Sequence, residues 1–176
     1  ESQILRFEQL NNIISISNGF SLNDLGCGYG AFYDFLRQKY DSFHYFGLDV
    51  SQDMIHAAQE CYRDRNNVQF IVSNIPAQPA DFSVASGIFN VRLGYSDNEW
   101  KDYIKANLDI LNRSSYVGFA FNCLTSFSDK NKMRDDLYYA EPCALFKLCK
   151  RHYSHNVAML HDYGLYEFTI LVRKKL

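Results

Sequence analysis

Residues 22–31, LNDLGCGYGA, decide the fold of this 176-residue chain. An apolar lead into three alternating glycines predicts a buried strand that turns sharply into a helix. Glycine accepts a positive φ and lets a ligand approach the backbone where a Cβ would otherwise stand. Asp24, just before the first glycine, is expected at the carboxyl end of the strand, which is the edge where open α/β sheets bind ligands. A carboxylate there favours a ligand that carries an ammonium group.

The glycine spacing alone does not choose the ligand. Gly26, Gly28 and Ala31 also satisfy the dinucleotide-binding pattern G-x-G-x-x-A. Asp49 ends the next apolar strand, about 20 residues further on, where a ribose-binding carboxylate is expected for either kind of cofactor. Asp24 makes the difference, because dinucleotide-binding loops normally have an apolar residue at that place.

The pattern D-x-G-x-G-x-G, followed by the strand-end Asp49, resembles the Rossmann-like (class I) S-adenosylmethionine-dependent methyltransferases. The resemblance covers nearly the whole chain and is strongest over residues 22–90. It implies transfer of a methyl group from S-adenosylmethionine to an acceptor. Because this cofactor carries an already activated methyl group, the protein is expected mainly to position and desolvate the reactants.

The resemblance also implies which residues contact the cofactor. The turn would hold the methionine end, strand-end residues the ribose and adenine, and the segment after the fourth strand the sulfonium. In chain order these residues are Asp24, Gly26, Cys27, Gly28, Gly30, Asp49, Val50, Met54, Asn74, Ile75, Ser86 and Gly87. Ser73-Asn74 departs from the usual Gly-Asp of the third strand, although an Asn amide can still accept a hydrogen bond from the adenine amino group.

Structural alternatives stay open for several of these residues. Asp49 could serve the start of the next helix, for which Ser51 is itself a good N-cap. Met54 could fill a gap in the core. Asn74 could be a turn residue ahead of Pro76. Arg6, on the first predicted helix, is either an exposed cation or a partner for the methionine carboxylate.

Composition indicates an ordinary globular domain, with 47% hydrophobic and 22% charged residues, and we expect residues 1–176 to form one domain. A net charge of −2 disfavours a nucleic-acid partner. The five cysteines lack metal-ligand spacing, so we expect reduced thiols and no metal site. The sequence has neither a bilayer-spanning stretch nor a signal-peptide pattern, so we expect a cytoplasmic protein.

Hydrophobic periodicity predicts an α/β fold in which strands and helices alternate. The expected helices are 2–17, 31–40, 52–63, 97–111 and 141–151, and the expected strands are one ending at 24–25 and those at 43–49, 68–72, 82–88, 115–121, 156–161 and 166–173. We expect a doubly wound, mostly parallel seven-stranded sheet with helices on both faces. The turn at 162–164 is too short for a crossover, so the last two strands must pair antiparallel. That feature fits the methyltransferases better than the all-parallel dinucleotide fold.

The sequence predicts the acceptor and the catalytic group least well. Tyr138, His155 and His161 lie in elements that could border the pocket, but each is more readily explained as structural. An N-P-P-Y motif of amino-group nucleic-acid methylation does not follow the fourth strand, which favours a small-molecule acceptor such as a sugar or a carrier-linked metabolite. Two alternatives remain: an NAD(P)-dependent oxidoreductase or epimerase, and a non-catalytic adapter with the methyltransferase fold. The polar segment 122–137 is either a lid over the acceptor or a solvated loop.

Overall fold

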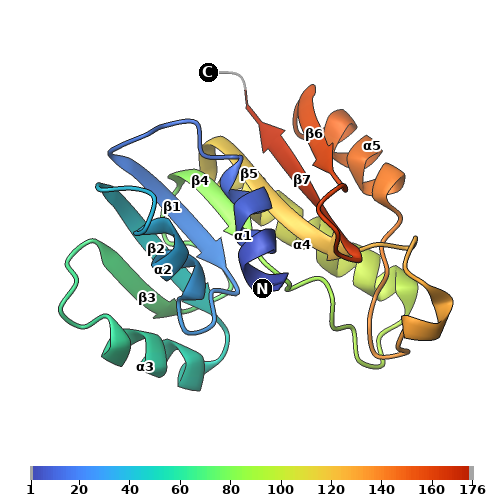
Figure 1. Cartoon of the computed structure of the whole chain (residues 1–176), viewed down its shortest axis with the longest axis horizontal. Helices are drawn as coiled ribbons and strands as arrows, with labels where there is room; N and C mark the ends of the chain where they lie inside the picture. The colour runs from blue at the N-terminus through green and yellow to red at the C-terminus, as the bar shows by residue number, and fades with distance from the viewer. Residues whose placement is uncertain (1, 175–176) are drawn as a thin grey trace.

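A computed structural model describes residues 2–174 and contains a seven-stranded sheet in the order β3-β2-β1-β4-β5-β7-β6 (Figure 1). The strands are β1 (Phe20–Leu25), β2 (Phe43–Asp49), β3 (Val68–Val72), β4 (Ala80–Ala85), β5 (Ser115–Leu124), β6 (Asn156–Leu160) and β7 (Glu167–Arg173). The pairs that join β3, β2, β1, β4 and β5 are all parallel. β7 pairs antiparallel with both β5 and β6, which confirms the prediction of an antiparallel strand near the C-terminus.

Helices cover both faces of this sheet (Figure 1). They are α1 (Ser2–Asn11), α2 (Ala31–Leu36), α3 (Gln52–Cys61), α4 (Asp97–Arg113) and α5 (Pro142–His152), with a single 3₁₀ turn, η1 (Lys130–Lys132). Buried side chains of α1, α2 and α3 share one hydrophobic cluster with β1 and β2, whereas α4 and α5 contribute to a second cluster with β5 and β7. The predicted doubly wound α/β fold is therefore confirmed.

The helix starts follow from local capping chemistry. The Ser51 hydroxyl accepts a hydrogen bond from the Met54 amide at the start of α3. A reciprocal capping box between Ser96 and Glu99 opens α4. In α5 the Glu141 side chain caps the first turn, ahead of a proline at a position where its missing amide hydrogen has no consequence.

Four predicted ends were wrong by three residues or more. The helix predicted to end at residue 40 ends at Leu36, and turns with i→i−3 hydrogen bonds follow it. The first helix ends at Asn11 and not at 17, since the next residues form single turns before Gly19 takes φ +74°. β4 ends at Ala85 because Gly87 adopts φ +78° and turns the chain away from the sheet. β5 continues to Leu124 because β7 supplies pairing partners up to the Leu124–Glu167 pair.

The strand order reverses at β1, which lies between β2 on one side and β4 on the other. In open α/β sheets the crevice at such a switch point, outside the carboxyl ends of the strands, is where ligands bind. The quoted glycine turn leaves β1 at this point, so the fold places it at the expected binding edge. No helix within residues 2–174 combines the length and apolar character needed to cross a bilayer.

Candidate cofactor-binding site

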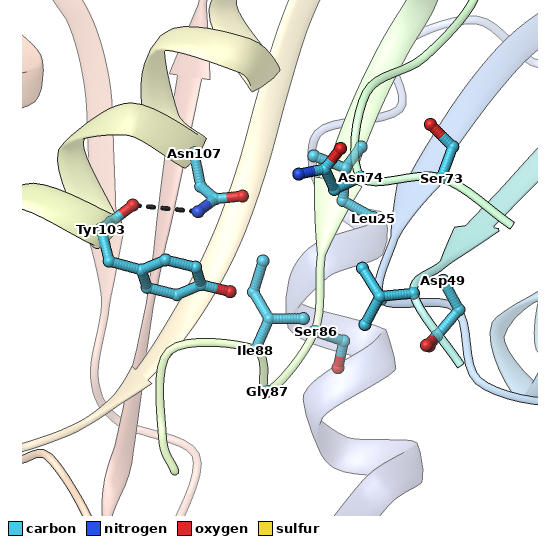
Figure 2. Close-up of a pocket in the computed structure, with 11 residues that line it drawn as sticks. Leu25, Asp49, Ser73, Asn74, Ser86, Gly87, Ile88, Tyr103 and Asn107 are labelled. Carbon is cyan, nitrogen blue, oxygen red and sulfur yellow. Dashed lines mark hydrogen bonds between the residues drawn. The ribbon is translucent and has the colours of Figure 1, made fainter. Parts of the chain in front are cut away.

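A cavity of about 290 Å³ opens at the carboxyl ends of β1, β2, β3 and β4, and α4 closes one side (Figure 2). Its lining residues are Leu25, Gly26, Asp49, Val50, Ser73, Asn74, Ser86, Gly87, Ile88, Tyr103 and Asn107. Four strand ends and one helix therefore contribute, although their residues lie up to about eighty positions apart in the chain. Its place at the switch point makes this cavity the candidate ligand site.

Backbone donors hold the Asp49 carboxylate at the cavity edge. The Gly28 amide donates to Asp49 Oδ2 at 2.9 Å, and the Ser51 amide donates to Oδ1, also at 2.9 Å. The turn itself is tied to β2 because the Gly26 and Cys27 amides both donate to the Leu48 carbonyl. Each carboxylate oxygen keeps a second lone pair, so Asp49 can still accept hydrogen bonds from ligand hydroxyls.

The three glycines of the turn differ in what surrounds them. A Cβ on Gly26 would lie 2.1 Å from Ile88 Cγ2, and one on Gly30 would lie 2.8 Å from both the Phe70 and Tyr62 rings. A Cβ on Gly28 would meet no atom within 4 Å. Gly28 therefore leaves open space where a ligand could approach the backbone. Gly30 allows α2 to pack closely against the core, and the lack of a Cβ on Gly26 makes room for Ile88.

Asp24 lies behind the turn and is only 1% exposed. The Tyr45 hydroxyl donates to its Oδ2 at 2.5 Å, but its buried Oδ1 has no hydrogen-bond partner among residues 2–174. Burial raises the pKa of Asp24 to about 7; the Tyr45 hydrogen bond opposes this rise and the nearby Asp49 charge adds to it. A buried carboxylate oxygen without a partner fits a ligand that brings a cation or a donor, as the ammonium of S-adenosylmethionine would.

The structure brings together about half of the residues predicted to contact the cofactor. Those that line the cavity are Gly26, Asp49, Val50, Asn74, Ser86 and Gly87. Asp24, Cys27, Gly28 and Gly30 belong to the adjoining turn but not to the lining. Met54 and Ile75 are exposed and lie outside the lining, so the geometry gives no support to their predicted contact with adenine. Val50, which follows Asp49 directly, is one of the apolar residues that do line the cavity.

A hydrogen-bond network ties the β4 end of the cavity to the N-terminal helix. The Gly87 amide donates to Asn122 Oδ1 at 2.9 Å, and Asn122 Nδ2 donates to Glu167 Oε2 at 2.6 Å. Arg6 completes the network by donating from Nε and Nη2 to the two oxygens of Glu167, at 2.7 and 2.8 Å. Arg6 is therefore a partner of a buried carboxylate, rather than a lone exposed cation.

Sequence reasoning did not assign Tyr103 or Asn107 to the site. Both lie on the side of α4 that carries the buried Trp100 and Ile104, and this side also forms a wall of the cavity. The signal that could have identified them is a polar Asn in an otherwise apolar helical stripe. Asn107 Nδ2 donates to the Tyr103 carbonyl oxygen at 2.9 Å, and burial raises the pKa of the Tyr103 hydroxyl.

None of the three weak catalytic candidates lines this cavity. Tyr138 is buried in the cluster beneath α4, and its amide donates to the Asn90 carbonyl. His155 and His161 are exposed. Within residues 2–174 no group of three or more His, Cys, Asp or Glu side chains could hold a metal ion, and the five cysteines are free thiols.

Comparisons with known proteins agree with this geometry. Residues 23–114 match the family described as "Methyltransferase domain". A protein of Mycobacterium tuberculosis (strain ATCC 25618 / H37Rv), named "Putative methyltransferase Rv1506c", is 59% identical over 162 residues, which span 92% of this chain and 98% of that protein.

Solved structures share the fold at low sequence identity. The methyltransferase domain of a bacterial CtHen1-C is 12% identical with a TM-score of 0.73, and the match covers 100% of both chains. Magnesium protoporphyrin IX methyltransferase of Synechocystis PCC 6803, with bound S-adenosylhomocysteine, is 16% identical with a TM-score of 0.68, over 98% of this chain and 81% of that one. The family match and the Mycobacterium tuberculosis relative support the methyltransferase interpretation of the glycine turn over the nicotinamide-dependent one. The chain belongs to the Rossmann-like, class I family of S-adenosylmethionine-dependent methyltransferases.

Proposed function

We propose that this methyltransferase binds S-adenosylmethionine in the cavity at the carboxyl ends of β1–β4 and methylates a small-molecule acceptor. The observation that carries the proposal is the pairing of two carboxylates there: Asp49 at the cavity edge and Asp24, with an unpartnered oxygen, behind the turn. When bound, the cofactor would supply a sulfonium methyl group: an acceptor lone pair would attack the methyl carbon in line with the C–S bond, which breaks and leaves neutral S-adenosylhomocysteine.

The methionine end of the cofactor carries an ammonium group, whereas the ribose carries neutral hydroxyl groups. Each of the two carboxylates would bind one of these groups. Asp24 Oδ1 would accept from the ammonium of the methionine end, directly or through water, and the open space over Gly28 admits that end. Asp49 would accept from the ribose hydroxyls while its backbone donors keep it in place. Val50 would cover one face of the adenine from the cavity edge.

The segment after β4 would hold the reacting end. Ser86 and Gly87 line the cavity, and the Gly87 amide is already bonded to Asn122. That bond fixes the path of the turn, which is a positioning role: the backbone wall keeps a constant shape when the ligand binds. The chain's contribution is then to orient the reactants and to exclude water from them.

A small-molecule acceptor is supported by the charge and by the residues after β4. The net charge of −2 offers no general attraction for a polyanion. Residues 86–90 read SGIFN, with no N-P-P-Y motif of the amino-group nucleic-acid methyltransferases. A sugar or a carrier-linked metabolite is the acceptor class we propose.

Calorimetry with S-adenosylhomocysteine tests the cofactor site. We expect Asp49→Ala to weaken binding by roughly tenfold or more, because a charge-assisted hydrogen bond is lost. Asp53→Ala is the matched control. Asp53 is an exposed carboxylate in the first turn of α3 and lies outside the cavity lining. Thermal unfolding without ligand checks that both variants fold. Equal affinity of wild type and Asp49→Ala would refute the assignment.

Transfer of a labelled methyl group tests the acceptor class. Purified protein and methyl-labelled S-adenosylmethionine are incubated with cell extract separated into small-molecule, nucleic-acid and protein fractions. We expect label in the small-molecule fraction with wild type and a strongly reduced amount with Asp49→Ala. Label confined to nucleic acid or protein would contradict a small-molecule acceptor while leaving the cofactor site intact.

A further inference from the structure

Two amide side chains face each other across the cavity, Asn74 after β3 and Asn107 on α4 (Figure 2). Asn74 stands where the family resemblance leads one to expect an acid that accepts from the adenine amino group. It is exposed, so burial does not fix which end of its amide faces the cavity. Asn107 comes from the opposite wall and is only 9% exposed.

The orientation of the Asn107 amide is fixed by its hydrogen-bond partner. Its Nδ2 lies 2.9 Å from the Tyr103 carbonyl oxygen, one helical turn earlier. A carbonyl oxygen can only accept, so the amide nitrogen must face it. The Asn107 Oδ1 is thereby turned toward the cavity, as Figure 2 shows, and it presents an acceptor there.

The wall that carries Asn107 is rigid. The Trp100 ring stacks on Tyr103 with 4.6 Å between centroids, and the Trp100 indole nitrogen donates to the Phe89 carbonyl at 2.8 Å. This bond ties α4 to the segment after β4, about two helical turns before Asn107. A polar group on a packed helix selects its ligand more sharply than one on a loop, because its position is fixed before binding.

We propose that Asn107 is the specificity-determining residue for the base, with its Oδ1 accepting from the adenine amino group and Asn74 lying opposite. This inference rests on the proposed function. Adenine presents an amino donor at the position where guanine presents a carbonyl acceptor, and hypoxanthine resembles guanine there. A fixed acceptor therefore favours adenine and disfavours a 6-oxo base, while the exposed Asn74 amide can present either its oxygen or its nitrogen.

Two ligands and two variants test this assignment by calorimetry, without any acceptor. The ligands are S-adenosylhomocysteine and S-inosylhomocysteine, in which the amino group is replaced by a carbonyl oxygen. The variants are Asn107→Leu, which keeps the branched shape of the side chain and removes the acceptor, and Asn112→Leu, the same change on the same helix outside the cavity lining. Thermal unfolding without ligand compares their stability.

We expect wild type and Asn112→Leu to bind the adenine ligand roughly tenfold or more tightly than the hypoxanthine ligand. Asn107→Leu should lose about tenfold in affinity for the adenine ligand and bind the two ligands about equally. Equal affinity of wild type for both ligands would overturn the inference, and this comparison needs no variant to fold. A full preference retained by Asn107→Leu would overturn it as well. Binding of neither ligand to wild type would instead refute the proposed function.

Discussion

Asp24 and Glu167 are both buried acids at the same edge of the sheet, yet their surroundings are opposite. Glu167 is 6% exposed and receives hydrogen bonds from Arg6 and Asn122 on both of its oxygens. Asp24 is 1% exposed, receives one hydrogen bond from Tyr45, and keeps one oxygen without a partner among residues 2–174. The hydrogen bonds to Glu167 are complete and stabilise the fold, whereas Asp24 keeps one carboxylate oxygen to which a ligand could donate.

The physical basis of this difference is desolvation. A buried carboxylate is stable only when donors or cations replace the water it has lost. Glu167 has them from within the chain. Asp24 lacks them, so the ligand-free protein favours its protonated form, and a cationic ligand would favour the ionised form.

The largest expected effect is therefore the pH dependence of stability at Asp24. Its folded pKa, about 7, lies above the ordinary value of 3.8. The protonated Asp24 carboxyl therefore contributes to the stability of the folded state. This contribution is complete below pH 3.8 and is lost as the pH rises toward 7, because the unfolded chain releases this proton first. The whole difference corresponds to roughly 4 kcal/mol. The groups that face Asp24 are Tyr45 and Asp49 from β2 and Cys27 from the turn.

Denaturant unfolding of wild type and Asp24→Asn, from pH 4 to pH 8, measures this effect. We expect wild type to lose stability relative to Asp24→Asn across that range, since Asn cannot ionise. Parallel curves would show that Asp24 titrates normally and that its surroundings are not incomplete.

The second effect is the stability that Glu167 provides. Glu167→Ala should reduce the free energy of unfolding by about 3 kcal/mol, because it leaves Arg6 and Asn122 without their acceptor. Removing one partner of a buried ion pair usually costs about 3–5 kcal/mol. We expect the lower value because the Arg6 side chain is 23% exposed. Glu167→Gln keeps the volume and one acceptor oxygen, so it should cost less. Glu167→Ala with wild-type stability would remove the contrast with Asp24.

The smallest effect separates packing from open space within the glycine turn. Gly28 and Gly30 both have positive φ, so replacement by Ala strains the backbone by roughly 1 kcal/mol at either position. Gly30→Ala also forces a methyl group against two buried rings, so it should be the less stable variant in thermal unfolding. Gly28→Ala should instead weaken S-adenosylhomocysteine binding more than it lowers stability. The reverse order would mean that the open space over Gly28 is not part of the site.

Local patterns predicted the features that depend on neighbouring residues. The glycine turn, the strand-end Asp49 and the antiparallel C-terminal strand all follow from chemistry within a few positions, and the structure places them as expected. The order of helices and strands follows for the same reason, whereas three of their ends depended on tertiary pairing or on a glycine conformation.

Local sequence patterns could not predict contacts between residues that lie far apart in the chain. Arg6 and Glu167 are 161 positions apart, and no local feature marks either as the other's partner. Asn107 lies within a helix that the sequence predicts, but only the fold shows that its side of the helix forms a wall of the cavity. Met54 and Ile75 lie outside the cavity lining, and their contact with the adenine stays a prediction that rests on their positions in a motif.

A crystal structure of the complex with S-adenosylhomocysteine would show whether both carboxylates bind the cofactor. We expect the ribose hydroxyls on Asp49, the adenine between Asn74 and Asn107, and the ammonium group as the partner of Asp24 Oδ1, directly or through one water. A ligand bound outside this cavity, or a complex in which Asp24 Oδ1 still has no partner, would contradict this expectation.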